Sequence, residues 1–347
     1  MRRIKRPHRL ARILSPLGGA YAAVMHLRAQ AFQKGLFRSW APPACCVSIG
    51  NIRWGGTGKT QITDWLLHWC QENGRRPVVL TRGYGGTPPH TPYLVSQGSR
   101  PEHSGDEPLM LARKHPEAKI VVDPVRARAG AWAWEHFAPD LFILDDGFQH
   151  LAVKRNLDLV LLSPDDLGPG WNRVIPGGTW REAQSALHRA HCFLVNATGQ
   201  DGASLWDRAQ NRLKRFATPI FLFQTKAGQL LCAADNAPAR VDPSAGYLLV
   251  TGIANPHRAL HTASEIMHRP PEEHLVFPDH HAYSEKDAAD ILATADSRNC
   301  PVILTTPKDA VKLQALPSDR LFTLSLSLSF PPGPGEPFES WIGARLR

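Results

Sequence analysis

A glycine-rich stretch that ends in a lysine and a threonine carries the clearest chemical signal in the sequence. Its residues are Gly55, Gly56, Thr57, Gly58, Lys59 and Thr60. Glycines allow backbone N–H groups to approach a phosphate chain closely, and the positive N-terminus of a following helix stabilises the phosphate charge. In such a loop the lysine reaches the terminal phosphates and the threonine hydroxyl holds Mg²⁺. The stretch therefore predicts a site for a nucleoside triphosphate and Mg²⁺.

The segments that flank these glycines are those that a phosphate-binding loop requires. Residues 45–49 are mostly apolar, as in a short buried strand, and apolar residues recur with helical spacing after Lys59. The generic pattern GxxxxGK[ST] is broken at one position, because Arg53 stands where its first glycine is expected. The alternative is a glycine-rich hairpin with a solvated lysine. The order of strand, loop and helix favours the phosphate site.

A second predicted strand ends in acids, because the apolar residues 141–144 run directly into Asp145 and Asp146. A triphosphate site needs an acid at the C-terminal end of a strand to hold the Mg²⁺ shell. A turn capped by two aspartates is the simpler alternative. Gln149 and His150 follow on the same loop.

Two other groups of residues could move a proton or bind a metal. Asp106 and Glu107 open a predicted helix, where Asp106 could be only an N-cap. Beside a phosphate site, the two carboxylates could equally hold Mg²⁺ or accept a proton from an attacking hydroxyl. Asp279, His280 and His281 fit either metal ligation or a general base with an orienting partner, and the sequence leaves open which histidine would act.

Basic and aromatic residues also follow predicted strands. Arg82 and Tyr84 lie among glycines after the strand at 77–80, at the kind of position where α/β proteins bind ligands. An ordinary turn explains them equally well. Arg126 follows the strand at 119–122, where it could clamp a phosphate or be a solvated helix charge.

The alternation of predicted strands and helices implies parallel β-α units. We therefore expect a P-loop NTPase-like, doubly wound, mostly parallel α/β sheet with a second, smaller α/β domain and an N-terminal amphipathic helix. The expected ranges are 1–40 for a basic amphipathic helix that associates with membrane, 41–232 for the P-loop domain, 233–330 for the smaller domain and 331–347 for a tail.

The charge of the chain is concentrated at its N-terminus. The formal net charge is +9, and residues 1–40 contain nine basic residues and no acidic one. The remaining basic and acidic residues are equal in number. Apolar residues cover about half of the helical wheel over residues 14–36, which favours a helix on an anionic membrane surface over a nucleic-acid contact. The simpler alternative is a helix packed on its own domain.

Other kinds of N-terminal segment fit less well. A secretory signal is disfavoured by Pro16, Gly18 and Gly19, which interrupt its apolar region. A spanning helix is disfavoured by His26 and Arg28, which break the apolar run. The six cysteines show no CxxC spacing, so we expect reduced cysteines in a cytosolic environment.

Taken together, these motifs resemble those of the tetraacyldisaccharide 4'-kinases, the lipid A 4'-kinases of Gram-negative bacteria. The matching segments are 50–51, 55–60, 82–85, 105–108, 145–150 and 279–280. The resemblance implies transfer of the γ-phosphate of ATP to the 4'-hydroxyl of a tetraacylated disaccharide 1-phosphate lipid, giving lipid IVA in lipid A biosynthesis. It also implies a peripheral or monotopic position on the cytoplasmic face of the bacterial inner membrane, with no nucleic acid and no obligate protein partner.

The resemblance further implies a role for each matching residue. Asp106 acts as the base with His280, and Glu107 assists the metal. Lys59 and Thr60 hold the phosphates and Mg²⁺. The other matched positions are a nucleotide contact, Glu182, and residues on the phosphate and sugar side, Arg82, Tyr84, Arg126, Gln149 and His150.

One rival interpretation is a membrane-associated P-loop ATPase that acts as a conformational switch without a lipid substrate. It predicts ATP turnover and no phosphorylated lipid. A GTP-dependent switch would need an Asn-Lys-x-Asp motif, which the segment at 306–309 lacks. A kinase of a soluble sugar leaves the basic N-terminal segment unexplained.

Overall fold

The computed structural model describes residues 15–346 of the 347-residue chain. The chain divides into two compact units, and each unit is built from separate stretches of sequence. Among the described residues, unit 1 contains 15–82, 123–224 and 330–346, and unit 2 contains 83–122 and 225–329. The sequence had suggested continuous ranges instead. Residues 83–122 group with the later segment because their main helix packs on a helix near residue 310.

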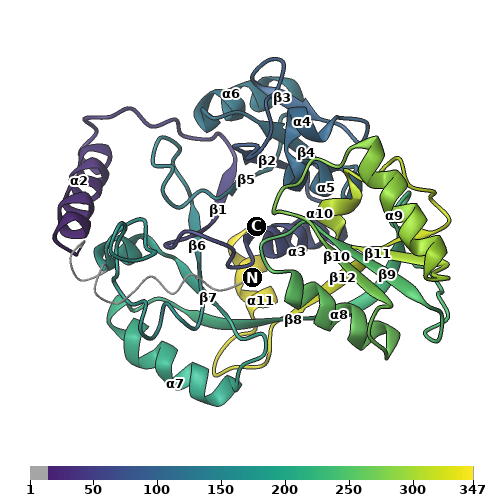
Figure 1. Ribbon diagram of the computed structural model, residues 1–347. Coiled ribbons are helices and arrows are strands. Elements are labelled where there is room, and N and C mark those ends of the chain that lie inside the picture. The colour runs from purple at the N-terminus through teal and green to yellow at the C-terminus, as the bar shows by residue number, and fades with distance from the viewer. Residues whose placement is uncertain (1–14, 347) are drawn as a thin grey trace. The chain divides into compact units, whose positions relative to one another are not determined.

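Unit 1 is built on a parallel sheet (Figure 1). Its strands, in spatial order, are β8 (Ile220–Cys232), β7 (Cys192–Asn196), β6 (Leu157–Leu162), β1 (Cys45–Asn51), β5 (Leu141–Asp145) and β2 (Pro77–Thr81). Every residue of β2 and β6 is buried, which explains the continuous apolar runs in their sequences. The chain runs from β1 to one side of the sheet and later to the other, so a topological switch point lies beside β1. Such points are where open α/β sheets bind ligands.

The described part of unit 1 also contains helices. They are α2 (Ser15–Gln33), α3 (Lys59–Glu72), α6 (Arg126–Phe137), α7 (Gly202–Leu213) and α11 (Phe338–Arg345), with 3₁₀ turns η1 (Gln184–Arg189) and η2 (Lys214–Phe216). In α3, Ile62, Leu66 and Cys70 repeat every four residues and are buried, because they form the face that packs on β1 and β5.

The last segment of the chain is more ordered than the sequence suggested. Residues 331–347 had been expected as a tail, but they contain α11. Phe338 of this helix contacts the rings of Trp65 and Phe221. The burial of its aromatic side chains explains why this short segment is helical despite the prolines and glycines that precede it.

Unit 2 contains a second parallel sheet and a short antiparallel pair. The parallel strands, in spatial order, are β10 (Glu273–Val276), β9 (Tyr247–Thr251), β11 (Val302–Thr305) and β12 (Leu321–Ser329). The part of β8 from residue 225 on belongs to this unit and lies beside β12. The antiparallel pair is β3 (Tyr93–Val95) and β4 (Lys119–Val122). The helices are α4 (Pro101–Ser104), α5 (Asp106–Lys114), α8 (Pro256–Met267), α9 (Glu285–Ser297) and α10 (Pro307–Ala310).

Both faces of the unit 2 sheet are covered, because successive residues of a strand point to opposite sides. In β9, Leu248 and Val250 pack in a cluster that includes Ile291 of α9. Tyr247 and Leu249 pack in another cluster that includes Ala263 of α8. This arrangement confirms the α/β class, with parallel strands and helices on both faces.

Candidate active site

The glycine-rich segment forms the loop that its sequence predicts. Strand β1 ends at Asn51 and helix α3 begins at Lys59, so residues 52–58 join a buried strand to a helix N-terminus. Gly55 and Gly58 have φ angles of 112° and 100°, in the left-handed region that favours glycine. The amide of Asn51 donates hydrogen bonds to Thr57 Oγ1 at 2.9 Å and to the carbonyl of Gly55 at 3.3 Å. Asn51 therefore holds the loop in a closed shape.

Arg53, which replaces the first glycine of the generic pattern, is bound to the loop at 163–166. Its Nη1 donates to Ser163 Oγ at 2.5 Å and lies 3.3 Å from Asp165 Oδ2 and 3.6 Å from Asp166 Oδ1. Asp166 also accepts a 2.8 Å bond from the indole of the buried Trp180. The arginine thus anchors the start of the phosphate loop to a buried carboxylate.

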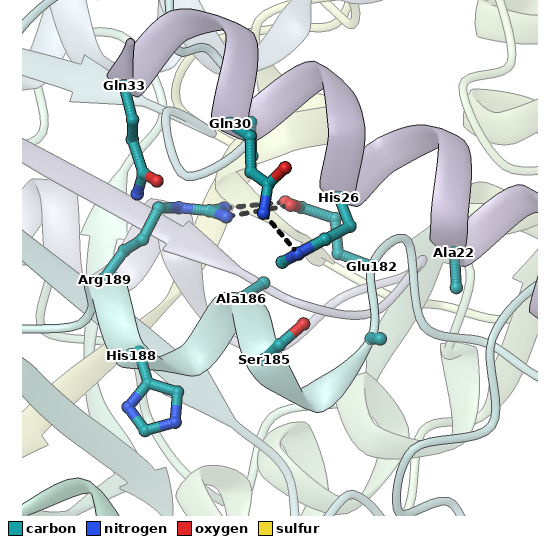
Figure 2. Close-up of a pocket in the computed structure, with 11 residues that line it drawn as sticks. Ala22, His26, Gln30, Gln33, Glu182, Ser185, Ala186, His188 and Arg189 are labelled. Carbon is teal, nitrogen blue, oxygen red and sulfur yellow. Dashed lines mark hydrogen bonds and ion pairs between the residues drawn. The ribbon is translucent and has the colours of Figure 1, made fainter.

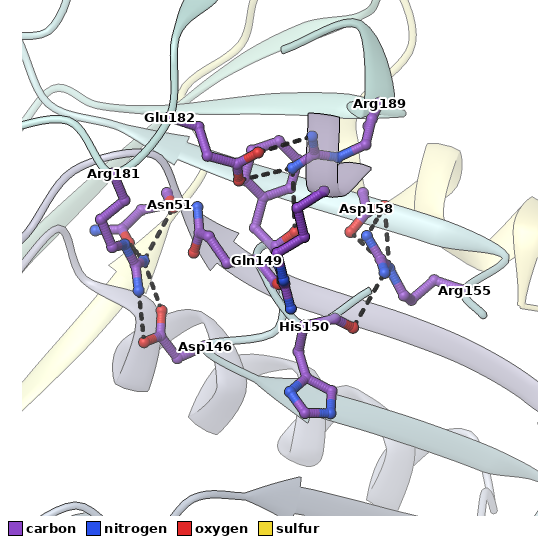
Figure 3. Close-up of polar contacts among 11 residues, drawn as sticks. Asn51, Asp146, Gln149, His150, Arg155, Asp158, Arg181, Glu182 and Arg189 are labelled. Carbon is purple, nitrogen blue, oxygen red and sulfur yellow. Dashed lines mark hydrogen bonds and ion pairs between the residues drawn. The ribbon is translucent and has the colours of Figure 1, made fainter. Parts of the chain in front are cut away.

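The acids at the end of β5 lie beside this loop. Lys59 Nζ is 3.4 Å from Asp146 Oδ1 and 3.3 Å from Asn51 Oδ1. Arg181 donates from Nη2 to Asp146 Oδ1 at 2.8 Å and from Nη1 to Asp146 Oδ2 at 3.0 Å (Figure 3). Burial alone would raise the pKa of Asp146, but the bonds from Arg181 and the charge of Lys59 lower it to about 2. Asp145 accepts a 3.0 Å bond from Thr81 Oγ1.

Arg181 and Asn51 are members of this site to which the sequence assigned no role, although segment 50–51 is among the matching motifs. Arg181 Nη2 also donates to the carbonyl of Asn51 at 3.0 Å, and Gln149 Nε2 donates to the same carbonyl at 3.0 Å. Asn51 directly follows a glycine at the end of β1, and Arg181 follows a glycine-rich turn. Those positions were the available signals in the sequence.

A group of cations lies on the same unit, around His150. Arg126 is 6% exposed, and its Nη1 donates to the carbonyl of Pro124 at 3.2 Å. Burial lowers the pKa of His150 to about 4, and the charges of Arg126, Arg155 and Arg28 act in the same direction. Nε2 of His150 and Nε of Arg126 are buried without a hydrogen-bond partner. The structure thus brings three expected residues, Gln149, His150 and Arg126, into a setting that suits an anion.

Unit 2 contains the other set of expected residues, centred on Asp106. Asp106 is the first residue of α5, is 7% exposed, and has Oδ2 at 3.1 Å from His280 Nδ1. The predicted pairing of these two residues is therefore present. His281 pairs with Asp287 instead, at 3.2 Å. Tyr84 belongs to this unit, where its ring centroid is 5.4 Å from that of His280.

Two lysines complete this second set, and the sequence reasoning missed both. Lys308 Nζ is 3.0 Å from His280 Nε2 and 3.6 Å from Glu107 Oε1. Lys312 Nζ is 3.1 Å from Asp106 Oδ2. Lys308 lies in α10 and Lys312 two residues after its end. The sequence pattern at 306–309 was informative only in lacking the Asn-Lys-x-Asp motif of GTP-dependent switches.

Comparison with known proteins identifies the family. A family model described as tetraacyldisaccharide-1-P 4'-kinase (LpxK) matches residues 10–347. The chain belongs to the LpxK family.

Individual LpxK relatives match over nearly their whole length. The tetraacyldisaccharide 4'-kinase of Oleidesulfovibrio alaskensis is 44% identical over 344 residues, covering 96% of this chain and 94% of that protein. The enzyme of the same name from Nitratidesulfovibrio vulgaris is 42% identical over 338 residues, which cover 97% of this chain and 94% of that protein. A crystal structure of LpxK from Aquifex aeolicus in complex with ATP has a TM-score of 0.75 and 25% identity, covering 97% of this chain and all of that one.

In this LpxK family member, Glu182 is bound to another side chain. It is 3% exposed, and Arg189 donates to its two oxygens at 2.8 and 3.0 Å. The guanidinium of Arg189 also lies 4.4 Å from the ring centroid of Phe148. Each oxygen of Glu182 retains a lone pair beyond the bond from Arg189, and the expected nucleotide contact stays a prediction.

The Glu182–Arg189 pair lines a cavity of about 110 Å³ beside α2. Figure 2 shows His26 and Gln30 of α2 pointing toward this pair. The cavity has a mixed polar and apolar lining, made by α2 residues (Ala22, His26, Ala29, Gln30, Gln33) and by residues of the 182–189 segment. Helix α2 is therefore attached to the LpxK fold on one face.

Proposed function

We propose that this protein is a kinase that transfers the γ-phosphate of ATP to the 4'-hydroxyl of a tetraacylated disaccharide 1-phosphate, the step that gives lipid IVA. Membership of the LpxK family supports this function. The structural observation that carries it is the contact of the buried Asp106 with the partly exposed His280, on a chain that also holds a glycine-rich phosphate loop with Lys59.

ATP binding rests on the loop at 55–60. Backbone N–H groups of the loop and of the α3 N-terminus bind the phosphates, and Lys59 neutralises the charge that develops on the γ-phosphate. Its ammonium is already positioned by Asn51 Oδ1 and Asp146 Oδ1. An electrostatic group that is oriented before the reaction costs no reorganisation in the transition state.

Asp106 is the proposed proton acceptor. A sugar hydroxyl is a poor nucleophile until a base takes its proton, and an aligned base contributes about 10²–10⁴-fold to the rate. The hydroxyl O–H bond breaks, the proton moves to Asp106, the oxygen attacks the γ-phosphorus, and the bond to the β-phosphate oxygen breaks to release ADP. His280 orients the carboxylate through its 3.1 Å contact.

Mg²⁺ fits the donor set of unit 1. Among residues 15–346 no group of three or more His, Cys, Asp or Glu side chains forms a metal site. Mg²⁺ needs no such group, since it commonly binds one or two carboxylates together with phosphate oxygens and water. Thr60, Asp145 and Asp146 would hold it there, and Glu107 is the proposed assisting acid. Bound Mg²⁺ would neutralise charge on the β- and γ-phosphates.

The acceptor lipid is the proposed ligand of five further residues: Arg82, Tyr84, Arg126, Gln149 and His150. The cationic surroundings of His150 suit a phosphorylated sugar, because the nearby arginine charges attract an anion and the buried Nε–H of Arg126 has no acceptor. Tyr84 is 76% exposed, so its ring is available to a sugar face.

The membrane is the proposed partner of α2. Within residues 15–346, no helix has the length and apolar character that crossing a bilayer requires. One side of α2 packs on unit 1 through Tyr21 and Ala22. On the other side Leu17, Val24 and Leu27 are 58–63% exposed. We propose that this exposed stripe lies in the membrane surface at the cytoplasmic face, where it meets the acyl chains of the substrate. The basic residues at 2–12, which lie outside the described part of the chain, would strengthen the contact.

The test is transfer of labelled phosphate from ATP to the tetraacyl disaccharide 1-phosphate in detergent micelles. We expect transfer by the intact protein and a loss of roughly a hundredfold or more in Asp106→Ala. Asp290→Ala, which removes an exposed acid of the same unit, is the matched control and should keep full activity. ATP hydrolysis without any phosphorylated lipid would instead favour the ATPase switch.

A further inference from the structure

Four side chains of unit 2 form a continuous row that begins and ends with a lysine. Lys308 Nζ lies 3.0 Å from His280 Nε2, His280 Nδ1 lies 3.1 Å from Asp106 Oδ2, and Lys312 Nζ lies 3.1 Å from the same Oδ2. The proposed function assigns roles to the two central members only. The two lysines therefore remain to be explained.

The contact with Lys308 decides which ring nitrogen of His280 carries the proton. An ammonium has protons to donate and no lone pair to offer, so His280 Nε2 must accept the hydrogen bond. A neutral imidazole that accepts at Nε2 carries its proton on Nδ1. That proton points at Asp106 Oδ2. Lys308 thus selects the one neutral tautomer in which His280 donates to the base.

The contact with Lys312 decides which oxygen of Asp106 remains for the substrate. His280 and Lys312 both bind Oδ2, and Oδ1 takes part in neither contact. His280 contacts Oδ2 by a hydrogen bond, and the Lys312 ammonium attracts the same oxygen as an ion pair without hydrogen-bond geometry. Together these two contacts favour one orientation of the carboxylate. Oδ1 is then the oxygen that accepts the proton of the sugar hydroxyl.

The surroundings of Lys312 support a positioning role. Its side chain is 7% exposed, and an ammonium is buried only where charges of opposite sign repay its desolvation. Asp309 Oδ1 is 3.6 Å away, and Asp309 Oδ2 accepts bonds from Thr306 Oγ1 at 2.7 Å and Gly252 N at 3.0 Å. The ring centroid of Tyr283 is 5.5 Å from the ammonium. Asp309 is thus fixed by two backbone segments and holds Lys312 in place.

The two lysines lie in one short segment of the chain. Lys308 is in α10 and Lys312 follows four residues later, a spacing that places side chains on the same side of a helical turn. Helix α10 packs on α5, whose first residue is Asp106. One short segment therefore delivers both cations to the pair.

We propose that Lys308 and Lys312 are positioning residues for the proton transfer, Lys308 by fixing the tautomer of His280 and Lys312 by turning Asp106 Oδ1 toward the acceptor hydroxyl. This inference rests on the proposed kinase function.

The experiment compares lipid phosphorylation by the wild type with that by Lys312→Met and Lys308→Met. We expect kcat to fall about 10- to 100-fold in each variant. This is less than the full rate contribution of an aligned base, because the base itself is still present. The KM for ATP should stay within about twofold, because neither lysine belongs to the phosphate loop. Lys286→Met removes an exposed lysine of the same unit that pairs with Asp290 and should leave kcat unchanged.

Two further measurements separate positioning from a general structural effect. In an Asp106→Ala background, adding Lys312→Met should lower kcat by less than about a further twofold. The reason is that the effects of two residues that act through one group do not add. Added ethylamine should restore part of the activity of Lys312→Ala. Circular dichroism and thermal unfolding monitor the fold, and Lys312→Arg, which keeps the charge, should retain more activity than Lys312→Met.

The outcomes are distinct. If the wild type phosphorylates the lipid and Lys312→Met keeps its kcat, the positioning role is wrong. Equal losses from Lys312→Met with and without Asp106 would also overturn it. If the wild type phosphorylates no lipid, the proposed kinase function is wrong. The wild-type measurement alone gives this result, so it is distinct from a failure of the positioning role.

Discussion

Arg181 binds the carboxylate of Asp146 through both terminal nitrogens, at 2.8 and 3.0 Å, while Lys59 Nζ lies 3.4 Å from the same group. The charge of Asp146 is therefore compensated before any ligand binds. The same pairing has a consequence for stability.

Asp146 should stabilise the fold at neutral pH and lose this effect in acid. Its pKa is about 2 in the folded chain, below the ordinary value of 3.8. A carboxyl whose pKa is lowered by folding stabilises above the unfolded value, and the effect disappears as the pH falls through the folded value. Asp146→Asn should therefore be less stable than the wild type at pH 7, and the gap should close between about pH 4 and pH 2. Urea unfolding over that range measures it, and a gap independent of pH would contradict the prediction.

His150 should remain neutral well below the pH at which an exposed histidine is protonated. Its folded pKa of about 4 lies below 6.5, so protonation disfavours the fold as the pH falls from 6.5 toward 4. His150→Gln should flatten the loss of stability in this window, whereas His261→Gln, at an exposed site, should not. NMR titration should also show the pKa of His150 rising when the acceptor lipid binds, since its phosphate would offset the charges of Arg126, Arg155 and Arg28. An unchanged pKa would argue against anion binding there.

Gly130 of α6 should tolerate no side chain. A Cβ at this position would overlap the ring of Trp40. Gly130→Ala should lower the free energy of unfolding by about 1–3 kcal/mol, the usual cost of overpacking. Gly19→Ala is the matched control, because α2 leaves open space around Gly19. Gly19→Ala should leave the free energy of unfolding unchanged or raise it by up to about 1 kcal/mol, because alanine has the higher helix propensity. Thermal unfolding of the two variants gives the comparison.

The exposed stripe of α2 should contribute to membrane binding. Replacing Val24 or Leu27 by Glu removes apolar surface and adds a charge that anionic lipid repels. We expect binding to vesicles with anionic lipid to weaken at least about fivefold per substitution, which corresponds to about 1 kcal/mol for a partly inserted side chain. Val276→Glu, on an exposed site of unit 2, should bind as the wild type does. Equal binding of the wild type and all variants to vesicles in co-sedimentation would show that the stripe does not contribute to membrane binding.

Local chemistry is what the sequence predicted best. Strand, glycine loop and helix follow one another between Cys45 and Glu72, so their order alone indicates the phosphate site. The same holds for most strands of the two sheets, because fully buried parallel strands leave continuous apolar runs. Strand β12 was missed although its Leu-Ser alternation from Leu324 is the period of a half-buried strand. Strand β3 was missed because three residues carry no detectable period.

The partners of the reactive groups were decided by the path of the chain. Asp106 and His280 are 174 residues apart, and Arg181 and Asp146 are 35 residues apart. Spacing along the sequence contains no information on such contacts. The contact of Asp106 with His280 arises because residues 83–122 fold with 225–329, which also brings α5 against α10 and Lys312 against Asp106. The sequence by itself determined which groups are able to do chemistry, since that depends on residue type and local backbone. Only the tertiary structure decided which oxygen, nitrogen or charge each group faces, because that depends on how distant segments pack.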